Sequence, residues 1–168
     1  GVCAANVPDG QAMWETSNSL WAAVQSGTNM VYHAAGWLEG GLTASFEKFI
    51  LDIEVLQMIA ELCQPVRFDE EELALDAIRE VGPGGHYFGC AHTMERYSTA
   101  FYTPLVSDWS NFGQWTENGS KTATQRANTI WKKLVTEFEP PAMDAGIRAE
   151  LDDYIERRIA AGGALPES

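Results

Sequence analysis

One helix restricts the fold of this chain more than any other segment. Residues 44–63 predict an α-helix whose apolar side chains fall on two faces instead of one. One face carries Phe46, Phe49, Ile50, Ile53, Leu56 and Ala60, and the other carries Leu51, Val55, Met58, Ile59 and Leu62. A helix with two apolar faces must be covered from two sides. We expect Thr43 to be its N-cap, with Glu47 at the positive end of the helix dipole.

The residues before this helix predict a short buried strand followed by a glycine-rich loop. The strand is expected at residues 30–33, and the loop carries His33, Trp37 and Glu39. In a strand–loop–helix unit the loop lies at the carboxyl end of the strand, where α/β enzymes place their chemistry. The same pattern fits a plain connection in which the glycines only make the turn. The residues alone leave both readings open.

The chain is rich in predicted helices and poor in predicted strands. Helices are expected at residues 11–25, 44–63, 70–81, 91–100, 123–138 and 144–161. Asp69 with Glu72, and Thr122 with Gln125, resemble capping boxes at the starts of two of them. Only residues 2–7 and 30–33 read as strands, which would pair in parallel through the first helix. Because two strands do not make a stable sheet, the chain is either a helical assembly with a small hairpin or the tail of a larger α/β protein.

Composition excludes several functional classes. The formal net charge of −13 is unsuited to nucleic acid and suits a partner with a basic docking face. No apolar run is long enough to span a membrane, and no basic segment opens a signal peptide. Cys3, Cys63 and Cys90 form no CxxC pair, so we expect a cytoplasmic chain without a disulfide framework.

Short motifs run in order along almost the whole chain. They are residues 7–11 (Val-Pro-Asp-Gly-Gln), 36–42 (Gly-Trp-Leu-Glu-Gly-Gly-Leu), 82–86 (Gly-Pro-Gly-Gly-His), 92–93 (His-Thr), 101–104 (Phe-Tyr-Thr-Pro), 107–108 (Ser-Asp), Trp115, 126–132 (Arg-Ala-Asn-Thr-Ile-Trp-Lys) and 139–141 (Glu-Pro-Pro). Their order and spacing resemble the trimethylamine methyltransferase family, the corrinoid-dependent methyltransferases of methylated amines and betaines. Where that family often has Ser-Asp-Arg, this chain has Trp109 after Asp108, which weakens an ion-pair role carried over to this position.

The resemblance implies an α/β fold. The family fold is a (β/α)8 TIM barrel, which needs about 250 residues. Residues 1–168 would then be its C-terminal fragment, predominantly helical, with one or two parallel strands and a helical C-terminal tail. Residues 1–64 would hold the last barrel βα units, and residues 65–168 a helical and irregular extension. A cloned fragment and a gene cut at an amber codon for pyrrolysine would both leave the upstream part missing.

The resemblance also implies a reaction. The family moves a methyl group from a methylated amine or quaternary amine to Co(I) of a corrinoid carried by a partner protein. We expect no metal of the chain's own. The fragment alone is expected to be inactive and to self-associate as a homo-oligomer, because a cut barrel exposes sheet edges and apolar helix faces.

Two candidate catalytic residues lie in the glycine-rich loop. His33 would meet a substrate carboxylate, and Glu39 would stabilise a cationic ammonium group by Coulomb attraction. Each also has a structural reading, as a hydrogen-bonded histidine and as a cap or loop acceptor.

Five candidate substrate-binding residues complete the expected site. Tyr32, Trp37 and Phe88 offer aromatic faces for a quaternary ammonium group, although core packing is the alternative for each. His86 would line the pocket or tie down its loop. Gln11 would contact substrate or belong to the cap of the first helix.

Two rival functions stay open. The chain could be a stand-alone helical interaction module that assembles through its acidic faces. It could also be a metal hydrolase using His86 and His92, with Cys90 between them, although this trio lacks a fourth ligand for a closed zinc site.

Overall fold

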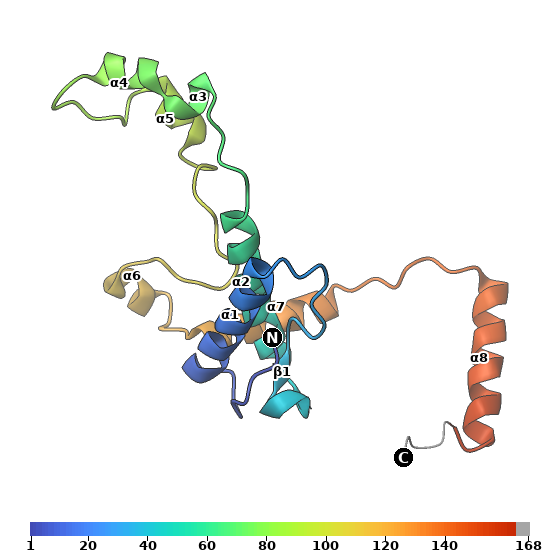
Figure 1. Cartoon of the computed structure of the whole chain (residues 1–168). Helices are drawn as coiled ribbons and strands as arrows, with labels where there is room; N and C mark the ends of the chain where they lie inside the picture. The colour runs from blue at the N-terminus through green and yellow to red at the C-terminus, as the bar shows by residue number, and fades with distance from the viewer. Residues whose placement is uncertain (164–168) are drawn as a thin grey trace. The chain divides into compact units, whose positions relative to one another are not determined.

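The computed structural model describes residues 1–163 and is mainly helical, with one two-stranded sheet among those residues (Figure 1). The helices are α1 (Gly10–Gln25), α2 (Phe46–Leu62), α3 (Glu70–Leu73), α4 (Leu75–Val81), α5 (Ala91–Arg96), α6 (Phe112–Glu117), α7 (Ala123–Thr136) and α8 (Ala145–Ala160). The strands are β1 (Trp37–Leu38) and β2 (Thr43–Ala44), joined by the 3-10 turn η1 (Glu39–Gly41). The chain forms two compact units, one from Gly1 to Leu134 and one that begins at Val135.

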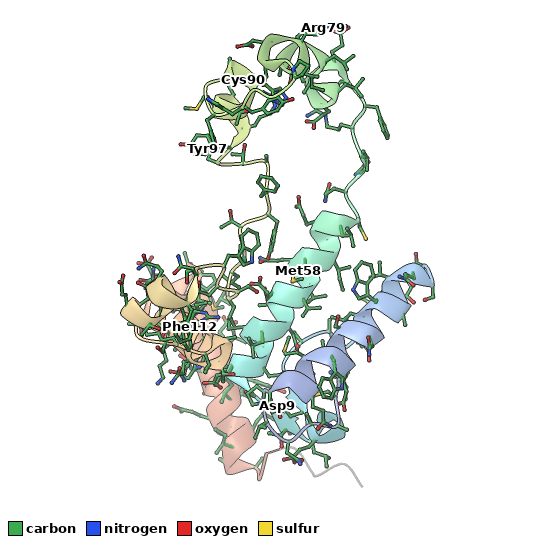
Figure 2. All side chains as sticks on the ribbon, turned by 90° about the vertical axis from the view of Figure 1, so that its left-hand side faces the viewer. Asp9, Met58, Arg79, Cys90, Tyr97 and Phe112 are labelled. Atoms are coloured by element: carbon green, nitrogen blue, oxygen red, sulfur yellow. The ribbon has the colours of Figure 1, made fainter. Side chains whose placement is uncertain are left out.

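The two longest helices of the first unit begin at side-chain caps. The Asp9 carboxylate accepts a hydrogen bond from the Ala12 amide at the start of α1, at 3.2 Å (Figure 2). The Ser45 hydroxyl accepts from the Lys48 amide at the start of α2, also at 3.2 Å. The expectation that Thr43 caps α2 is therefore wrong, because Thr43 is occupied by pairing in β2.

The predicted strand at residues 30–33 is also wrong. This segment is a bend and turn with His33 at a positive φ of 52°, and the strand lies further along at β1. β1 pairs with β2 as an antiparallel hairpin, so the expected parallel pairing is not found in the sheet. Residues 2–7 do approach this region in parallel, but through one bridge between Val2 and Trp37. The described residues hold no parallel sheet, and the barrel origin stays a prediction.

The remaining helices match the expectations in part. The Asp69 cap is confirmed, but the predicted helix 70–81 is broken at Ala74, whose positive φ of 50° separates α3 from α4. The Thr122 and Gln125 capping box is confirmed at the start of α7. Helix α5 is shorter than residues 91–100, and its caps Cys90 and Tyr97 lie at its two ends (Figure 2). Helix α6, capped by Asn111, was not expected from the sequence.

The core of the first unit lies where α1, α2 and α7 meet (Figure 1). Its buried members are Ile50 and Leu51 from α2, Val106, and Ala127 from α7, with Met13 of α1 packed against them. A second buried cluster joins the N-terminal segment, α1 and β1 and consists of Cys3, Ala5, Ala12 and Leu38. Both clusters are small. Long-range hydrogen bonds from Lys48, Asp52 and Glu54 therefore also help to fix the position of α2.

Helix α2 is covered less completely than its two apolar faces predict. Ile50, Leu51 and Ile59 are buried, but Met58 and Leu62 are 51% and 69% exposed (Figure 2 labels Met58). These exposed side chains border a mostly apolar groove beside α1. None of the helices described for residues 1–163 combines the length and apolarity that crossing a bilayer demands.

Candidate functional site

A hollow of about 490 Å³ lies beside the glycine-rich loop. Its walls carry the aromatic side chains of Trp37, Phe46 and Phe49. Ala35, Gly36, Ala44 and Ser45 complete the lining. The volume falls in the range of small-molecule sites, and such sites are lined mainly by apolar and aromatic groups.

The loop places further rings beside the hollow. The His33 imidazole meets Trp37 edge-on, with ring centroids 5.3 Å apart and an interplanar angle of 84°. Tyr32 follows at 6.5 Å from His33. On the other wall, Phe46 stacks on Trp131 of α7 with centroids 4.8 Å apart, which fixes its ring. Three of the residues predicted to bind or act on substrate are therefore in sequential ring contact.

Gly36 forms the floor of the hollow, and its backbone requires glycine. Its φ is +89°, a conformation that side-chain-bearing residues rarely adopt. A Cβ added here would lie 3.3 Å from two side-chain atoms of Phe49. Both backbone polar groups are used: the carbonyl accepts from the Ser45 amide at 2.9 Å, and the amide donates to Asp52 Oδ2 at 2.8 Å.

A buried ion pair lies directly behind Gly36. Lys48 and Asp52, one turn apart on α2, both have fully buried side chains. Lys48 Nζ donates to Asp52 Oδ1 at 2.5 Å and Oδ2 at 2.6 Å, and to the Thr16 hydroxyl of α1 at 2.7 Å. Burial raises the pKa of the Asp52 carboxyl, while Lys48 and the Gly36 amide act in the opposite direction. Among the described residues, Thr16 and the Gly36 amide are the further hydrogen-bond partners of this pair.

The N-terminal segment fixes the same loop from another direction. Cys3 Sγ donates to the Trp37 carbonyl at 3.2 Å, and the Cys3 carbonyl accepts from the Gly40 amide at 2.8 Å. The Ala5 carbonyl accepts from the Glu39 amide at 3.0 Å. The N-terminal segment therefore holds the backbone from Trp37 to Gly40, while Asp52 of α2 holds the preceding residue, Gly36.

The other predicted site residues lie in three places. Glu39 sits at the hairpin turn, exposed, and its carboxylate accepts from the Thr43 hydroxyl at 3.1 Å. Gln11 is in the first turn of α1 and donates to Glu15 at 2.8 Å. His86 and Phe88 lie together in the loop between α4 and α5, with ring centroids 5.8 Å apart. Within residues 1–163, no hydrogen bond or ring contact joins His86 or Phe88 to the Trp37 loop.

The residues of the suggested metal trio are engaged separately. His92 Nε2 lies 2.8 Å from the Glu71 carbonyl, and Cys90 Sγ lies 3.7 Å from a Glu80 carboxylate oxygen. Over the part of the chain that the structure describes, no three His, Cys, Asp or Glu side chains gather in a group suited to a metal ion.

A second polar cluster fastens residues 106–108 to the core. Glu54, buried on α2, accepts from the Val106 amide at 2.6 Å and the Ser107 hydroxyl at 3.2 Å. Asp108 lies 3.9 Å from Arg126 of α7, and hydrogen bonds from Ser110 lower the pKa of its carboxyl. An arginine from α7 therefore faces Asp108 although residue 109 is tryptophan.

Four residues in and behind the hollow were not predicted from the sequence as site residues. Phe46 and Phe49 were assigned to an apolar helix face, and they line the hollow instead. Lys48 and Asp52 were not singled out at all. A signal for them existed: two opposite charges four residues apart lie between the apolar positions of a helix expected to be covered on two sides.

The arrangement suits a small cation with apolar substituents. The aromatic walls offer faces that attract such a cation, and they offer no ammonium or guanidinium group that would repel it. Two carboxylates stand close by in the structure: Glu39 lies on the turn of the hairpin that contributes Trp37 and Ala44 to the lining, and Glu47 accepts a hydrogen bond from the lining residue Ser45. Such a site favours quaternary or tertiary ammonium groups over small inorganic ions.

Comparisons with known proteins place the chain in a family. The model of the trimethylamine methyltransferase family matches residues 1–163. The chain is 39% identical to a glycine betaine methyltransferase of Desulfitobacterium hafniense strain Y51, over 89% of this chain and 31% of that protein. It is 30% identical to the trimethylamine methyltransferase MttB of D. hafniense strain DCB-2, over 93% and 31%. It is 28% identical to MttB2 of Methanosarcina mazei, over 91% and 30%. The chain thus spans less than a third of the length of these relatives.

Proposed function

The chain belongs to the trimethylamine methyltransferase family, and from this premise we propose that it is the substrate-binding C-terminal part of a methyltransferase for quaternary amines of the glycine betaine type. The observation that carries the proposal is the hollow lined by Trp37, Phe46 and Phe49, with His33 edge-on to Trp37 and Tyr32 next to His33. Quaternary ammonium groups are bound by aromatic faces of this kind.

The identity values support the subclass. The glycine betaine enzyme shares 39% of its aligned residues with this chain, against 30% and 28% for the two trimethylamine enzymes. A quaternary ammonium group needs no proton donor, because its nitrogen already leaves as a neutral amine. The aromatic lining is consistent with that chemistry, since it supplies orientation and electrostatics in place of a strong general acid.

The reaction assigns limited duties to this chain. Its aromatic rings hold the ammonium group, Glu39 adds a negative charge nearby, and His33 would meet the carboxylate of a betaine. A corrinoid carried by a partner would supply Co(I) as the nucleophile for the methyl carbon. The C–N bond would break in the same step, with its electron pair staying on the amine nitrogen.

We assign that corrinoid to a separate partner protein. The hollow is lined by aromatic and small apolar residues with one serine, and this donor set does not suit a metal ligand. The partner would approach the open side of the hollow. We expect this to take place in the cytoplasm.

The barrel is part of the proposal as well. The remainder of a (β/α)8 barrel would lie outside these residues, as the length of the relatives suggests. Exposed Met58 and Leu62 on α2 are the kind of side chains that such a remainder would cover. Without it, we expect the chain to transfer no methyl group.

The test is methyl transfer by the whole protein that contains this chain. Purified protein is mixed with free cob(I)alamin and glycine betaine, trimethylamine or tetramethylammonium, and loss of the cob(I)alamin absorbance is followed. We expect turnover with glycine betaine, slowed about a hundredfold in Trp37→Leu because the methyl group loses its alignment.

A second tryptophan serves as the matched control. Trp115 lies on α6 outside the hollow, where it contacts Phe112 and donates to the Lys121 carbonyl. Trp115→Leu should retain the activity of the unchanged protein. Turnover with trimethylamine alone would contradict the assignment to quaternary amines. No turnover with any of the three compounds would contradict the whole proposal.

A further inference from the structure

We propose that Lys48 and Asp52 are positioning residues for the amine site: through the Gly36 amide, this buried pair sets the conformation of the loop that carries His33 and Trp37. The inference rests on the proposed function for its consequence in ligand binding. It goes beyond that function because neither residue lines the hollow.

The first support is that the pair is bonded to the loop and not only to its own helix. Asp52 Oδ2 accepts from Lys48 at 2.6 Å and from the Gly36 amide at 2.8 Å. Gly36 immediately precedes Trp37, whose ring forms one wall of the hollow. A change at Asp52 therefore reaches a wall residue through one hydrogen bond and one peptide.

The second support is that the position demands a carboxylate. Both oxygens of Asp52 accept hydrogen bonds, and an ionised carboxylate is acceptor-only at both. An asparagine of the same shape has one acceptor and one donor. It would leave either the Lys48 ammonium or the Gly36 amide facing a donor, in a place that water does not reach.

The third support is the free-energy cost of burying two charges. Burying two charges is unfavourable unless their geometry and remaining hydrogen bonds compensate, and apolar pairs of equal volume often serve stability as well or better. A helix start alone does not require this arrangement, because Ser45 already caps α2. The pair does what an apolar pair could not, since it holds a backbone amide whose residue has a positive φ.

Glu54→Gln gives a matched control for Asp52→Asn. Glu54 is a second buried carboxylate on α2, and it also accepts from a backbone amide, but from Val106 on the side away from the loop contacts. Both variants remove one charge from the same helix and keep its shape. A merely structural role for Asp52 predicts similar effects from the two substitutions.

The experiment compares the chain and the two variants by NMR, well below their melting temperatures. Three quantities are measured: hydrogen exchange of the Gly36 amide, the chemical shift of the Trp37 indole N–H, and the affinity for tetramethylammonium chloride. We expect Asp52→Asn to speed Gly36 exchange, to move the Trp37 resonance and to weaken tetramethylammonium binding about tenfold. Glu54→Gln should expose the Val106 amide and leave the other signals unchanged.

Two results would overturn the positioning role. One is a Gly36 amide and Trp37 resonance that are unchanged in Asp52→Asn, and the other is an equal change in Glu54→Gln. If tetramethylammonium does not bind the unchanged chain, the proposed function loses support, while the Gly36 and Trp37 signals still decide the positioning role.

A second variant keeps the test valid if Asp52→Asn does not fold. Thr16→Val preserves side-chain shape and removes the hydroxyl to which Lys48 donates at 2.7 Å. We expect faster Gly36 exchange than in Glu54→Gln, because the Lys48 ammonium then lacks one of the hydrogen bonds that fix it beside Asp52. Equal exchange in these two variants would contradict the proposal.

Discussion

Helices α2 and α8 are similar in length and in their N-terminal caps, but they differ in their contacts with the rest of the chain. They have 17 and 16 residues, and a side chain caps each at its N-terminus. α2 buries Lys48, Asp52 and Glu54 in contacts with distant segments. α8 has no buried residue among its described side chains, and its apolar residues are roughly half exposed. Local propensity therefore produces both helices, but long-range polar contacts fix only one of them.

The comparison explains where the site lies. A ligand site needs walls that stay in place, and the hollow is built on the N-terminal half of α2 and the loop bonded to it. α8 has an apolar stripe that includes Ile147, Leu151 and Ile155, and it shows no comparable set of buried partners. If the difference is energetic, substitutions at the contacts of α2 should lower stability more than substitutions in α8.

The largest effect is expected from breaking the buried pair. Lys48→Met leaves Asp52 buried without its partner and should destabilise the first unit by about 3–5 kcal/mol. The double variant Lys48→Met, Asp52→Leu should recover part of that loss, since it leaves no unpaired buried charge, although the Gly36 amide loses its acceptor. Urea unfolding followed by circular dichroism measures both. Equal stability of Lys48→Met and the unchanged chain would show that the pair is not buried in solution.

The next effect is expected at Gly36. Gly36→Ala places a Cβ 3.3 Å from Phe49 on a backbone with φ +89° and should cost about 2–3 kcal/mol. The same substitution at Gly27, which also has a positive φ but has nothing within 4 Å of an added Cβ, is the control. It should cost less, because only backbone strain remains. Similar losses at the two glycines would remove the packing argument for Gly36.

A smaller effect depends on pH. Hydrogen bonds from Asn128 and Trp131 hold the pKa of the Glu47 carboxyl below its ordinary value of 4.5. Because the folded-state pKa is lowered, this stabilisation is full above about pH 4.5 and is lost as the pH falls through the folded value. Glu47→Gln should cost about 1–2 kcal/mol at neutral pH, and progressively less in acid. A difference that stays constant from pH 7 to about pH 3 would contradict this assignment.

The smallest effect is expected in α8. Asp144 accepts from the Gly146 and Ile147 amides at the start of this helix. Asp144→Ala should weaken α8 locally by about 1 kcal/mol and leave the unfolding midpoint of the first unit unchanged. Residue-resolved hydrogen exchange separates the two quantities. A loss of protection in α2 would show that α8 is coupled to the first unit.

The sequence predicted most helices because their signals are local. The caps Asp69 and Thr122 and the long apolar pattern of residues 44–63 lie within a few residues of what they specify. The strand was misplaced because residues 30–33 are apolar enough to read as buried, while the hairpin depends on Gly36 and on contacts with Cys3 and Ala5 from far away. Strand pairing is a long-range property, and a short apolar run does not specify it.

The candidate site shows the same difference between local signals and long-range contacts. The loop with Tyr32, His33, Trp37 and Glu39 was found because its glycines and its resemblance to the family are visible in one short stretch. Phe46, Phe49 and Asp52 were missed as site residues, because their relation to Gly36 exists only after α2 folds back against the loop. The roles of all the predicted site residues stay predictions, those of Tyr32, His33, Trp37 and Glu39 as much as those of His86, Phe88 and Gln11.

The most direct measurement follows the Trp37 indole resonance while the chain is titrated with glycine betaine and, separately, with 3,3-dimethylbutanoate. The second compound has the same shape but replaces the cationic nitrogen with carbon. We predict that glycine betaine shifts the Trp37 signal and binds about tenfold more tightly than the neutral-headed analogue, since only a cation is attracted electrostatically by the ring faces. Equal affinity for the two compounds, or no shift of Trp37 by glycine betaine, would contradict the assignment of this hollow to a quaternary ammonium group.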